Sequence, residues 1–224
     1  MSRTAPPRAI VFDLDGTLLD SLPLVLAAIT HAIEPHGGRP TMDIFSHLGG
    51  PPERFMGTLL KNPAHVPDAL RRMERFHREN EQLIQPFAGA LEIIATLHRA
   101  GIRTGVWTGR DRESTDRILQ RHALDRAFGT VVCGDDLPTH KPDPAGLREI
   151  LRRLDVPASE TIFIGDADVD VLGGASAGVD TLLIRHSRAI DASVLTRAWR
   201  ATATPREAYA VIAAALGETF QTIL

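Results

Sequence analysis

The sequence has few of the features that mark secreted, membrane or nucleic-acid-binding proteins. Its 224 residues include one cysteine, Cys133, which cannot form an internal disulfide and therefore fits a reducing compartment. Residues 1–8 lack the apolar core of a signal peptide, and no apolar run approaches the roughly 20 residues that span a bilayer. The formal net charge is −3, and arginines alternate with acids. We therefore expect a cytoplasmic protein without nucleic-acid or membrane partners.

Short apolar runs that alternate with helical patterns predict an α/β fold. The runs are rich in Val, Ile and Phe and do not alternate with polar residues, which is typical of strands buried on both faces. They occupy residues 9–13, 103–109, 130–135, 161–166 and 181–186. Apolar residues recur at helical spacing in residues 89–101, 111–124 and 143–156, with Asp111 as a predicted N-cap. This order predicts a doubly wound, Rossmann-like parallel sheet.

Residues 21–86 contain helical patterns but no strand-like run. Ser21 is predicted to cap a helix over "LPLVLAAITHAI", and residues 67–83 predict a second amphipathic helix. We expect residues 1–20 and 87–224 to form an α/β catalytic core and residues 21–86 an all-helical cap domain. An insert that follows the carboxyl end of a strand lies over the crevice where open α/β sheets bind ligands. A lid is therefore the favoured role, and helices packed sideways without a lid function are the alternative.

Charged and hydroxyl side chains lie at the ends of the predicted strands or shortly after them. They are Asp13, Asp15, Thr108, Lys141, Asp166, Asp168 and Asp170. Carboxylates two residues apart repel each other, and burial penalises both, so a cation or a reacting phosphorus is expected to use them. Mg²⁺ prefers oxygen ligands, usually one or two carboxylates with water and a phosphate oxygen. A lysine supplies a point charge for phosphate. If the strands are parallel, the pattern predicts one site for Mg²⁺ and a phosphoryl group.

Four short motifs occur in order along the chain. They are "DLDGT" from Asp13 to Thr17, Thr108, Lys141 in "KPDP", and "GDADVD" from Gly165 to Asp170. In these motifs the sequence resembles the haloacid dehalogenase superfamily, specifically its phosphoglycolate phosphatase-like members with a helical C1-type cap. The resemblance extends over nearly the whole chain, including the cap between the first two motifs. It implies a Mg²⁺-dependent phosphatase that acts on a small phosphorylated metabolite.

The resemblance also implies a role for each matching residue. Asp13 would attack phosphorus and form an aspartyl-phosphate. Asp15 would protonate the leaving oxygen and then accept a proton from the hydrolytic water. Thr108, Gly109 and Lys141 would bind the phosphoryl group.

The implied metal ligands come from the first and fourth motifs. Mg²⁺ would be bound by Asp13, the backbone carbonyl of Asp15, and Asp166, with Asp170 as a direct or water-mediated ligand. Asp168 is an additional acid in the fourth motif and is the alternative to Asp170, which matches the family's spacing.

Three further sets of residues have open roles. The second motif commonly continues with Asn, but here it reads "TGR", so Gly109 offers no side chain and the role of Arg110 is open. Asp135 and Asp136 are interpreted as loop caps rather than metal ligands. Arg54, in the turn-rich "GGPPER" of the cap, is predicted to bind the far end of an anionic substrate; an ordinary surface residue is the alternative.

Other functions fit the sequence less well. A phosphosugar mutase of the same family keeps Asp15 and is the main alternative; it would isomerise a hexose phosphate with little net phosphate release. Phosphorylation-controlled signalling domains also combine aspartates, Thr and Lys on a parallel sheet. However, their paired acids precede the phosphorylated aspartate, and they lack an inserted lid. A binding protein that has lost activity is disfavoured by the intact motifs.

Overall fold

A parallel sheet of six strands forms the centre of the molecule. The computed structural model describes residues 5–39, 52–186, 188 and 190–217, apart from the side chain of Arg54. The strand order is β5-β4-β1-β6-β7-β8. The strands are β1 (Ala9–Phe12), β4 (Arg103–Trp107), β5 (Thr130–Val132), β6 (Thr161–Gly165), β7 (Asp180–Ile184) and β8 (Arg200–Thr202). The chain runs outward from β1 to β4 and β5 and then crosses back to β6, which confirms the predicted doubly wound α/β class.

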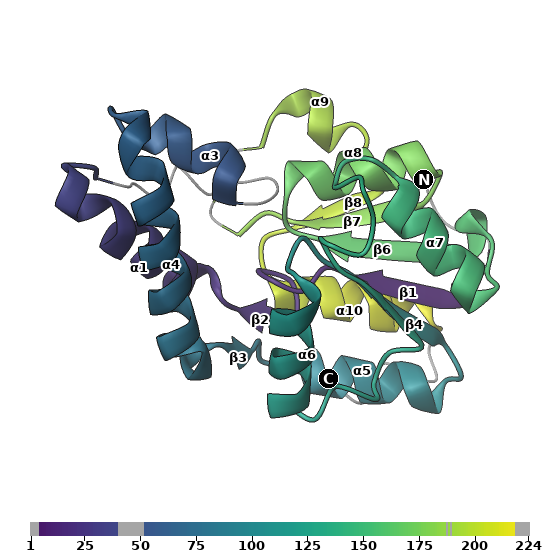
Figure 1. Ribbon diagram of the computed structural model, residues 1–224. Helices are drawn as coiled ribbons and strands as arrows, with labels where there is room; N and C mark the ends of the chain where they lie inside the picture. Colours follow the sequence, from purple (N-terminus) through teal and green to yellow (C-terminus); the bar gives the residue numbers. More distant parts are fainter. Residues whose placement is uncertain (1–4, 40–51, 187, 189, 218–224) are drawn as a thin grey trace.

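Helices cover both faces of the sheet (Figure 1). One face carries α5 (Ala90–Arg99), α6 (Arg112–Arg121) and α10 (Pro205–Ala215); the other carries α7 (Ala145–Leu154) and α8 (Asp168–Ala177). Alternate residues of β1 supply the two cores: Ile10 and Phe12 pack with the first group, and Ala9 and Val11 pack with α7. The short elements η4 (Ala158–Glu160) and α9 (Ala192–Leu195) precede β6 and follow β7. Within the described residues, no helix is both long and apolar enough to span a membrane.

A helical unit lies beside the sheet and is joined to it by two adjacent short strands (Figure 1). These strands, β2 (Leu19–Asp20) and β3 (Gln85–Pro86), pair antiparallel. Between them lie α1 (Leu22–Ile33), η1 (Glu34–His36), α3 (Pro52–Leu59), η2 (Pro63–His65), α4 (Val66–Asn80) and η3 (Glu81–Leu83). The unit has its own buried cluster, which includes Ile29, Met56 and Ala69. We call it the helical insert and keep residues 21–86 as its predicted extent.

The sixth strand was not predicted from the sequence. β8 is an edge strand of three residues, of which two are exposed, so it lacks the apolar run that identifies the inner strands. The inner strands are also shorter than predicted. Asp13, Thr108 and Asp166 lie just beyond the ends of β1, β4 and β6, and this leaves their side chains at the edge of the sheet.

The predicted capping role of Ser21 is wrong. Ser21 occupies the N-cap position of α1, but its side chain makes no capping hydrogen bond, and its backbone is helical rather than extended. Its hydroxyl donates instead to Oδ1 of Asp15 at 2.5 Å. An ionised carboxylate is a stronger acceptor than a neutral group, so the Ser21 hydroxyl binds Asp15 instead of capping the helix. In contrast, Asp111 caps α6 as predicted and accepts a hydrogen bond from the Ser114 N–H at 2.8 Å.

A buried tyrosine of α10 holds the loop after β1. The hydroxyl of Tyr209 donates to the carbonyl oxygen of Thr17 at 2.6 Å, and the side chain is fully buried. The same loop contains Asp15, so a residue near the end of the described chain supports a motif near its start.

We expect Tyr209→Phe to lower the free energy of unfolding by about 1–3 kcal/mol, because it leaves the buried Thr17 carbonyl without its donor. Urea denaturation followed by circular dichroism measures this change. As a control, Arg78→Gln removes an exposed ion pair with Glu74 and should change stability by less than about 0.5 kcal/mol. Equal stability of Tyr209→Phe and the wild type would contradict the role given to this hydrogen bond.

Candidate active site

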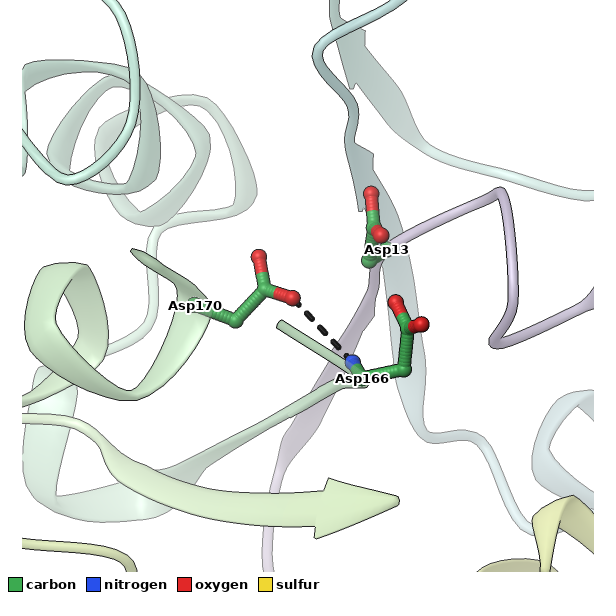
Figure 2. A group of neighbouring side chains, drawn as sticks. All are labelled: Asp13, Asp166 and Asp170. Carbon is green, nitrogen blue, oxygen red and sulfur yellow. Dashed lines mark hydrogen bonds between the residues drawn. The ribbon is translucent and has the colours of Figure 1, made fainter. Parts of the chain in front are cut away.

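Three buried aspartates meet at the carboxyl edge of the sheet. Asp13 directly follows β1, Asp166 follows β6, and Asp170 lies in the first turn of α8 (Figure 2). One oxygen atom from each carboxylate lies within 4.8 Å of the other two. β1 and β6 are neighbouring parallel strands, and the N–H of Asp13 extends their ladder by donating to the Ile164 carbonyl at 2.7 Å. This register brings the first and fourth motifs together.

Asp170 is held by the turn that precedes α8. Its Oδ2 accepts hydrogen bonds from the N–H of Asp166 at 3.1 Å, drawn in Figure 2, and from the N–H of Ala167 at 2.9 Å. Gly165 leaves room for this carboxylate, because a Cβ at that position would lie 2.4 Å from the Asp170 carboxyl carbon. The spacing in "GDADVD" therefore follows from a turn whose backbone binds its own last aspartate.

Lys141 is the cation in contact with this group. Its Nζ donates to Oδ1 of Asp13 at 2.8 Å and to Oδ1 of Asp170 at 2.7 Å. The ammonium also lies 5.1 Å from the ring centroid of Trp107 and 5.4 Å from that of Phe163. Aromatic faces attract cations, so the two rings and the two carboxylates together fix the position of Lys141.

The charges in this group are unbalanced. Burial, together with repulsion from Asp170, raises the pKa of the Asp13 carboxyl to about 7, although Lys141 opposes the shift. Burial and repulsion from Asp13 and Asp170 also raise the pKa of Asp166. Burial lowers the pKa of Lys141, but its two carboxylate partners outweigh this and raise it above its usual value. The charges of Arg188 and Lys141 oppose the shift at Asp166 without cancelling it, so an additional cation would stabilise the ionised forms of the three carboxylates.

The donor set fits a hard divalent cation. All three carboxylates offer oxygen atoms, which are the ligands of Mg²⁺ and Ca²⁺ in proteins, and their clustering leaves an excess of negative charge where a cation would bind. Asp15 lies outside this group of three carboxylates. Its implied contribution through the backbone carbonyl stays a prediction.

Gly16 allows the loop after β1 to pass close to Asp166. Its φ is +72°, a backbone conformation that favours glycine, and a Cβ would lie 2.4 Å from Oδ2 of Asp166. On the other side of the loop, the Gly16 carbonyl oxygen lies 2.7 Å from Nε2 of His186. Gly16 of "DLDGT" thus permits the turn and also leaves room for the Asp166 carboxylate.

Asp15 forms a second charged pair in the site. Its Oδ2 accepts from Nε of Arg110 at 2.8 Å, and its Oδ1 accepts from Nη2 of Arg110 at 2.6 Å and from the Ser21 hydroxyl. Burial alone would raise the pKa of the Asp15 carboxyl, but Arg110 and Ser21 lower it below its usual value. The second acid of the first motif is therefore ionised and bound by three hydrogen bonds.

The second motif lies at the same edge of the sheet, beyond β4. Thr108 is buried, its N–H donates to the Val132 carbonyl at 3.0 Å, and its Oγ1 accepts from the N–H of Arg110 at 3.1 Å. Gly109 lies beside Gly134, where a Cβ would come within 2.3 Å of the Gly109 carbonyl oxygen. Because β4 neighbours β1, Thr108 and Gly109 lie at the edge that carries Asp13.

Asp135, Asp136 and Asp168 lie outside the group of three carboxylates. Arg54 belongs to α3, but its side chain is outside the described part of the structure, as are residues 49–51, the first half of "GGPPER". Asp168 begins α8, and its buried Oδ1 has no hydrogen-bond partner among the described residues. Asp135 accepts from the Arg112 N–H and Asp136 from the Cys133 N–H, both at 2.8 Å, as expected of loop caps.

Several residues of the site were not identified from the sequence. Trp107, Phe163 and Ser21 carry no signal of their own, because an aromatic residue in an apolar run or a serine before a helix is interpreted as packing or capping. Arg110 did carry a signal, since it follows Thr108 directly. What it contacts depends on the fold.

We expect Gly16→Ala to weaken Mg²⁺ binding by about 10–100-fold, because the new Cβ displaces the Asp166 carboxylate. Isothermal titration calorimetry with Mg²⁺ alone measures this without a substrate. Gly178→Ala is the matched control: its φ is +73°, but a Cβ there has no neighbour within 4 Å, so it tests backbone strain without the clash. Similar Mg²⁺ affinities for the two variants would show that contact with Asp166 is unimportant.

Comparison with known proteins agrees with this geometry. The family model described as haloacid dehalogenase-like hydrolase matches residues 10–184. Pyrophosphatase PpaX of Halalkalibacterium halodurans is 30% identical over 181 residues, which cover 80% of this chain and 83% of that protein. A phosphoglycolate phosphatase of Pseudomonas syringae pv. tomato is 33% identical over 191 residues, 80% of this chain and 70% of that protein.

A solved structure extends the likeness to the whole fold. A Thermotoga maritima protein, provisionally named a β-phosphoglucomutase, has a TM-score of 0.73 and 25% identity, with 92% of this chain and 98% of that chain covered. The family model matches well over half of the sequence and includes all four motifs. The chain therefore belongs to the haloacid dehalogenase-like hydrolases, as its motifs indicate.

Proposed function

We propose that this hydrolase is a Mg²⁺-dependent cytoplasmic phosphatase that acts on a small phosphorylated metabolite through an aspartyl-phosphate on Asp13. The observation that carries the proposal is the surroundings of Asp13. Lys141 donates a hydrogen bond to one of its oxygens, and Asp166 and Asp170 each place a carboxylate oxygen close enough to share a metal ion with it. Related proteins named phosphoglycolate phosphatase and pyrophosphatase support the substrate class. Family membership supports the reaction type.

The three-carboxylate group would hold the metal. Asp13 and Asp166 would be direct ligands, with the backbone carbonyl of Asp15, and Asp170 would bind directly or through water. When bound, Mg²⁺ would neutralise charge on the phosphoryl oxygens and on the carboxylates around them.

The residues of this chain would carry out the two chemical steps. In the first, Asp15, which is ionised while it is bound to Arg110, takes up a proton on leaving that partner; an Asp13 oxygen then bonds to phosphorus as the bond to the leaving oxygen breaks, and Asp15 gives its proton to that oxygen. In the second, Asp15 accepts a proton from water, whose oxygen bonds to phosphorus and releases Asp13 and inorganic phosphate. Lys141, the Thr108 hydroxyl and the backbone at Gly109 would bind the phosphoryl oxygens. Donors placed in advance around the transferred group supply most of the stabilisation in phosphoryl transfer.

The helical insert would act as the lid over this site. It leaves the core at β2, directly after the loop that carries Asp15, and returns at β3. Two adjacent connections suit a hinge. Arg54, on α3, remains the predicted contact for the far end of the substrate.

A phosphosugar mutase is the second candidate, because the Thermotoga maritima structure has that provisional name. The two functions differ in product. A phosphatase releases inorganic phosphate in proportion to substrate consumed, whereas a mutase interconverts hexose phosphates when primed with a bisphosphate.

Asp13→Asn should abolish hydrolysis, because an amide is a poor nucleophile and offers no charge to the metal. Phosphate release from p-nitrophenyl phosphate with Mg²⁺ tests this, and EDTA should stop the wild type. The exposed Asp125→Asn is the control for the same chemical change and should keep wild-type turnover. Appreciable steady-state hydrolysis by Asp13→Asn would overturn the proposed nucleophile.

Asp15→Asn should separate substrates by their leaving groups. Alkyl phosphates need a proton on the leaving oxygen and should lose about 10²–10⁴-fold in rate, whereas p-nitrophenyl phosphate needs little protonation in the first step and should lose less. The rate of the first step, measured in single-turnover experiments, compares the two. An equal loss for both substrates would argue against Asp15 as the acid.

A further inference from the structure

The guanidinium of Arg110 is built into the site and is not used in the steps above. Its side chain is 9% exposed, and its Nε and Nη2 donate to the two oxygens of Asp15 at 2.8 and 2.6 Å. Two parallel hydrogen bonds of this kind are the geometry by which arginine binds carboxylates and phosphates. The planar fork of Arg110 therefore faces Asp15, the proposed acid.

The guanidinium is also supported on its other side. Its Nη1 donates to the Ser114 hydroxyl at 2.9 Å, and that hydroxyl donates to Oε1 of Glu81 at 3.2 Å. Glu81 has Arg117 at 3.3 Å and Arg121 at 3.9 Å as further partners, so it does not depend on Arg110 for its charge balance. These contacts would keep the fork in place if Asp15 turned away.

Asp15 must turn away for the proposed chemistry. As acid and base it has to place an oxygen on the leaving oxygen and later on water, but here both oxygens are bound by Arg110 and one also by Ser21. When an oxygen of Asp15 moves, a buried guanidinium donor loses its acceptor, which is unfavourable unless another acceptor arrives. Movement of Asp15 would thus leave Arg110 in need of a second anionic acceptor.

The position of that acceptor follows from distances. The nitrogens of Arg110 lie 2.6 and 2.8 Å from the oxygens of Asp15, and a general acid works within about 3.2 Å of the oxygen that it protonates. When one oxygen of Asp15 moves to the leaving oxygen and the carboxylate stays beside Arg110, the nearer nitrogen of Arg110 lies within about 6 Å of the leaving oxygen. An anionic group two or three bonds from that oxygen can reach the fork.

We propose that Arg110 binds an anionic group of the leaving group, next to the oxygen that departs, and so selects phosphate esters or anhydrides whose leaving group carries a second negative charge. This inference rests on the proposed phosphatase function. A carboxylate and a second phosphoryl group both have the required chemistry, and the experiment separates them. Helix α4 of the insert contributes His77, whose pKa is lowered by burial and by the charge of Arg110, so the insert comes near the guanidinium.

The test compares kcat/KM for three substrates with Mg²⁺ in the wild type, Arg110→Gln and Arg110→Lys. The substrates are 2-phosphoglycolate, with a carboxylate; inorganic pyrophosphate, with a second phosphoryl group; and 2-hydroxyethyl phosphate, whose leaving group is uncharged. Each value is divided by that of the same variant for p-nitrophenyl phosphate. This ratio removes differences in the amount of folded enzyme.

We expect the wild type to prefer at least one anionic substrate over 2-hydroxyethyl phosphate by at least about 10-fold. Arg110→Gln should reduce that preference by about 10–100-fold, the range for loss of hydrogen bonds to a charged group, mainly through a higher KM. Arg110→Lys should retain part of it, since it keeps the charge but not the fork. Arg112→Gln is the control, because Arg112 pairs with Asp136 and lies outside the site; its preference should equal that of the wild type.

The outcomes separate the alternatives. If Arg110→Gln loses the kcat/KM preference for 2-phosphoglycolate alone, the bound group is a carboxylate. If it loses the preference for pyrophosphate alone, the bound group is a phosphoryl group. A wild type without preference for either anionic substrate overturns the proposal, as does a variant in which all substrates fall by the same factor, since Arg110 then only positions Asp15. If Arg110→Gln does not fold, the substrate preference of the wild type and its decrease in Arg110→Lys still test the proposal. Failure of the wild type to release phosphate from any of the four substrates would instead reject the proposed function.

Discussion

Repulsion among Asp13, Asp166 and Asp170 is the constraint around which the rest of the site is organised. Three carboxylates at this depth disfavour each other's ionised forms, and Lys141 balances only part of their charge. Such a cluster is tolerated only where surrounding groups hold each member in place. Here the supports are the backbone N–H groups before α8 and the aromatic pair of Trp107 with Phe163 beneath the ammonium.

The fold supplies these supports because the site lies where the winding of the sheet reverses. β1 lies between β4 and β6, so the ends of three neighbouring strands deliver the first, second and fourth motifs to one edge. Steric contact, rather than charge, then limits how closely the backbone can approach the carboxylates. Gly16 and Gly165 are positions where any Cβ would collide with a carboxylate, and this explains two of the glycines in the motifs in physical terms.

A second layer of charges joins the core to the helical insert. Asp15 is bound by Arg110, Arg110 by Ser114, and Ser114 by Glu81, which lies at the end of the insert where the chain returns to the core. Tyr209 of the core also supports the loop of Asp15, through its hydrogen bond to the Thr17 carbonyl. The loop that carries the second acid is therefore fixed by contacts from both structural units, and movement of the insert would act on it through Glu81.

The sequence alone determined the α/β class, the order of the motifs and the identity of the carboxylates, because buried strands, helical spacing and acids at strand ends are local patterns. It could not determine which partner each charged group takes. Ser21 was predicted to cap a helix and instead binds Asp15, and Arg110 had no predicted role although it makes the site's bidentate ion pair. β8 was missed because a three-residue edge strand has no apolar run. Asp15 and Arg110 are far apart in the sequence, and only the packing of β4 against β1 brings them within hydrogen-bond distance.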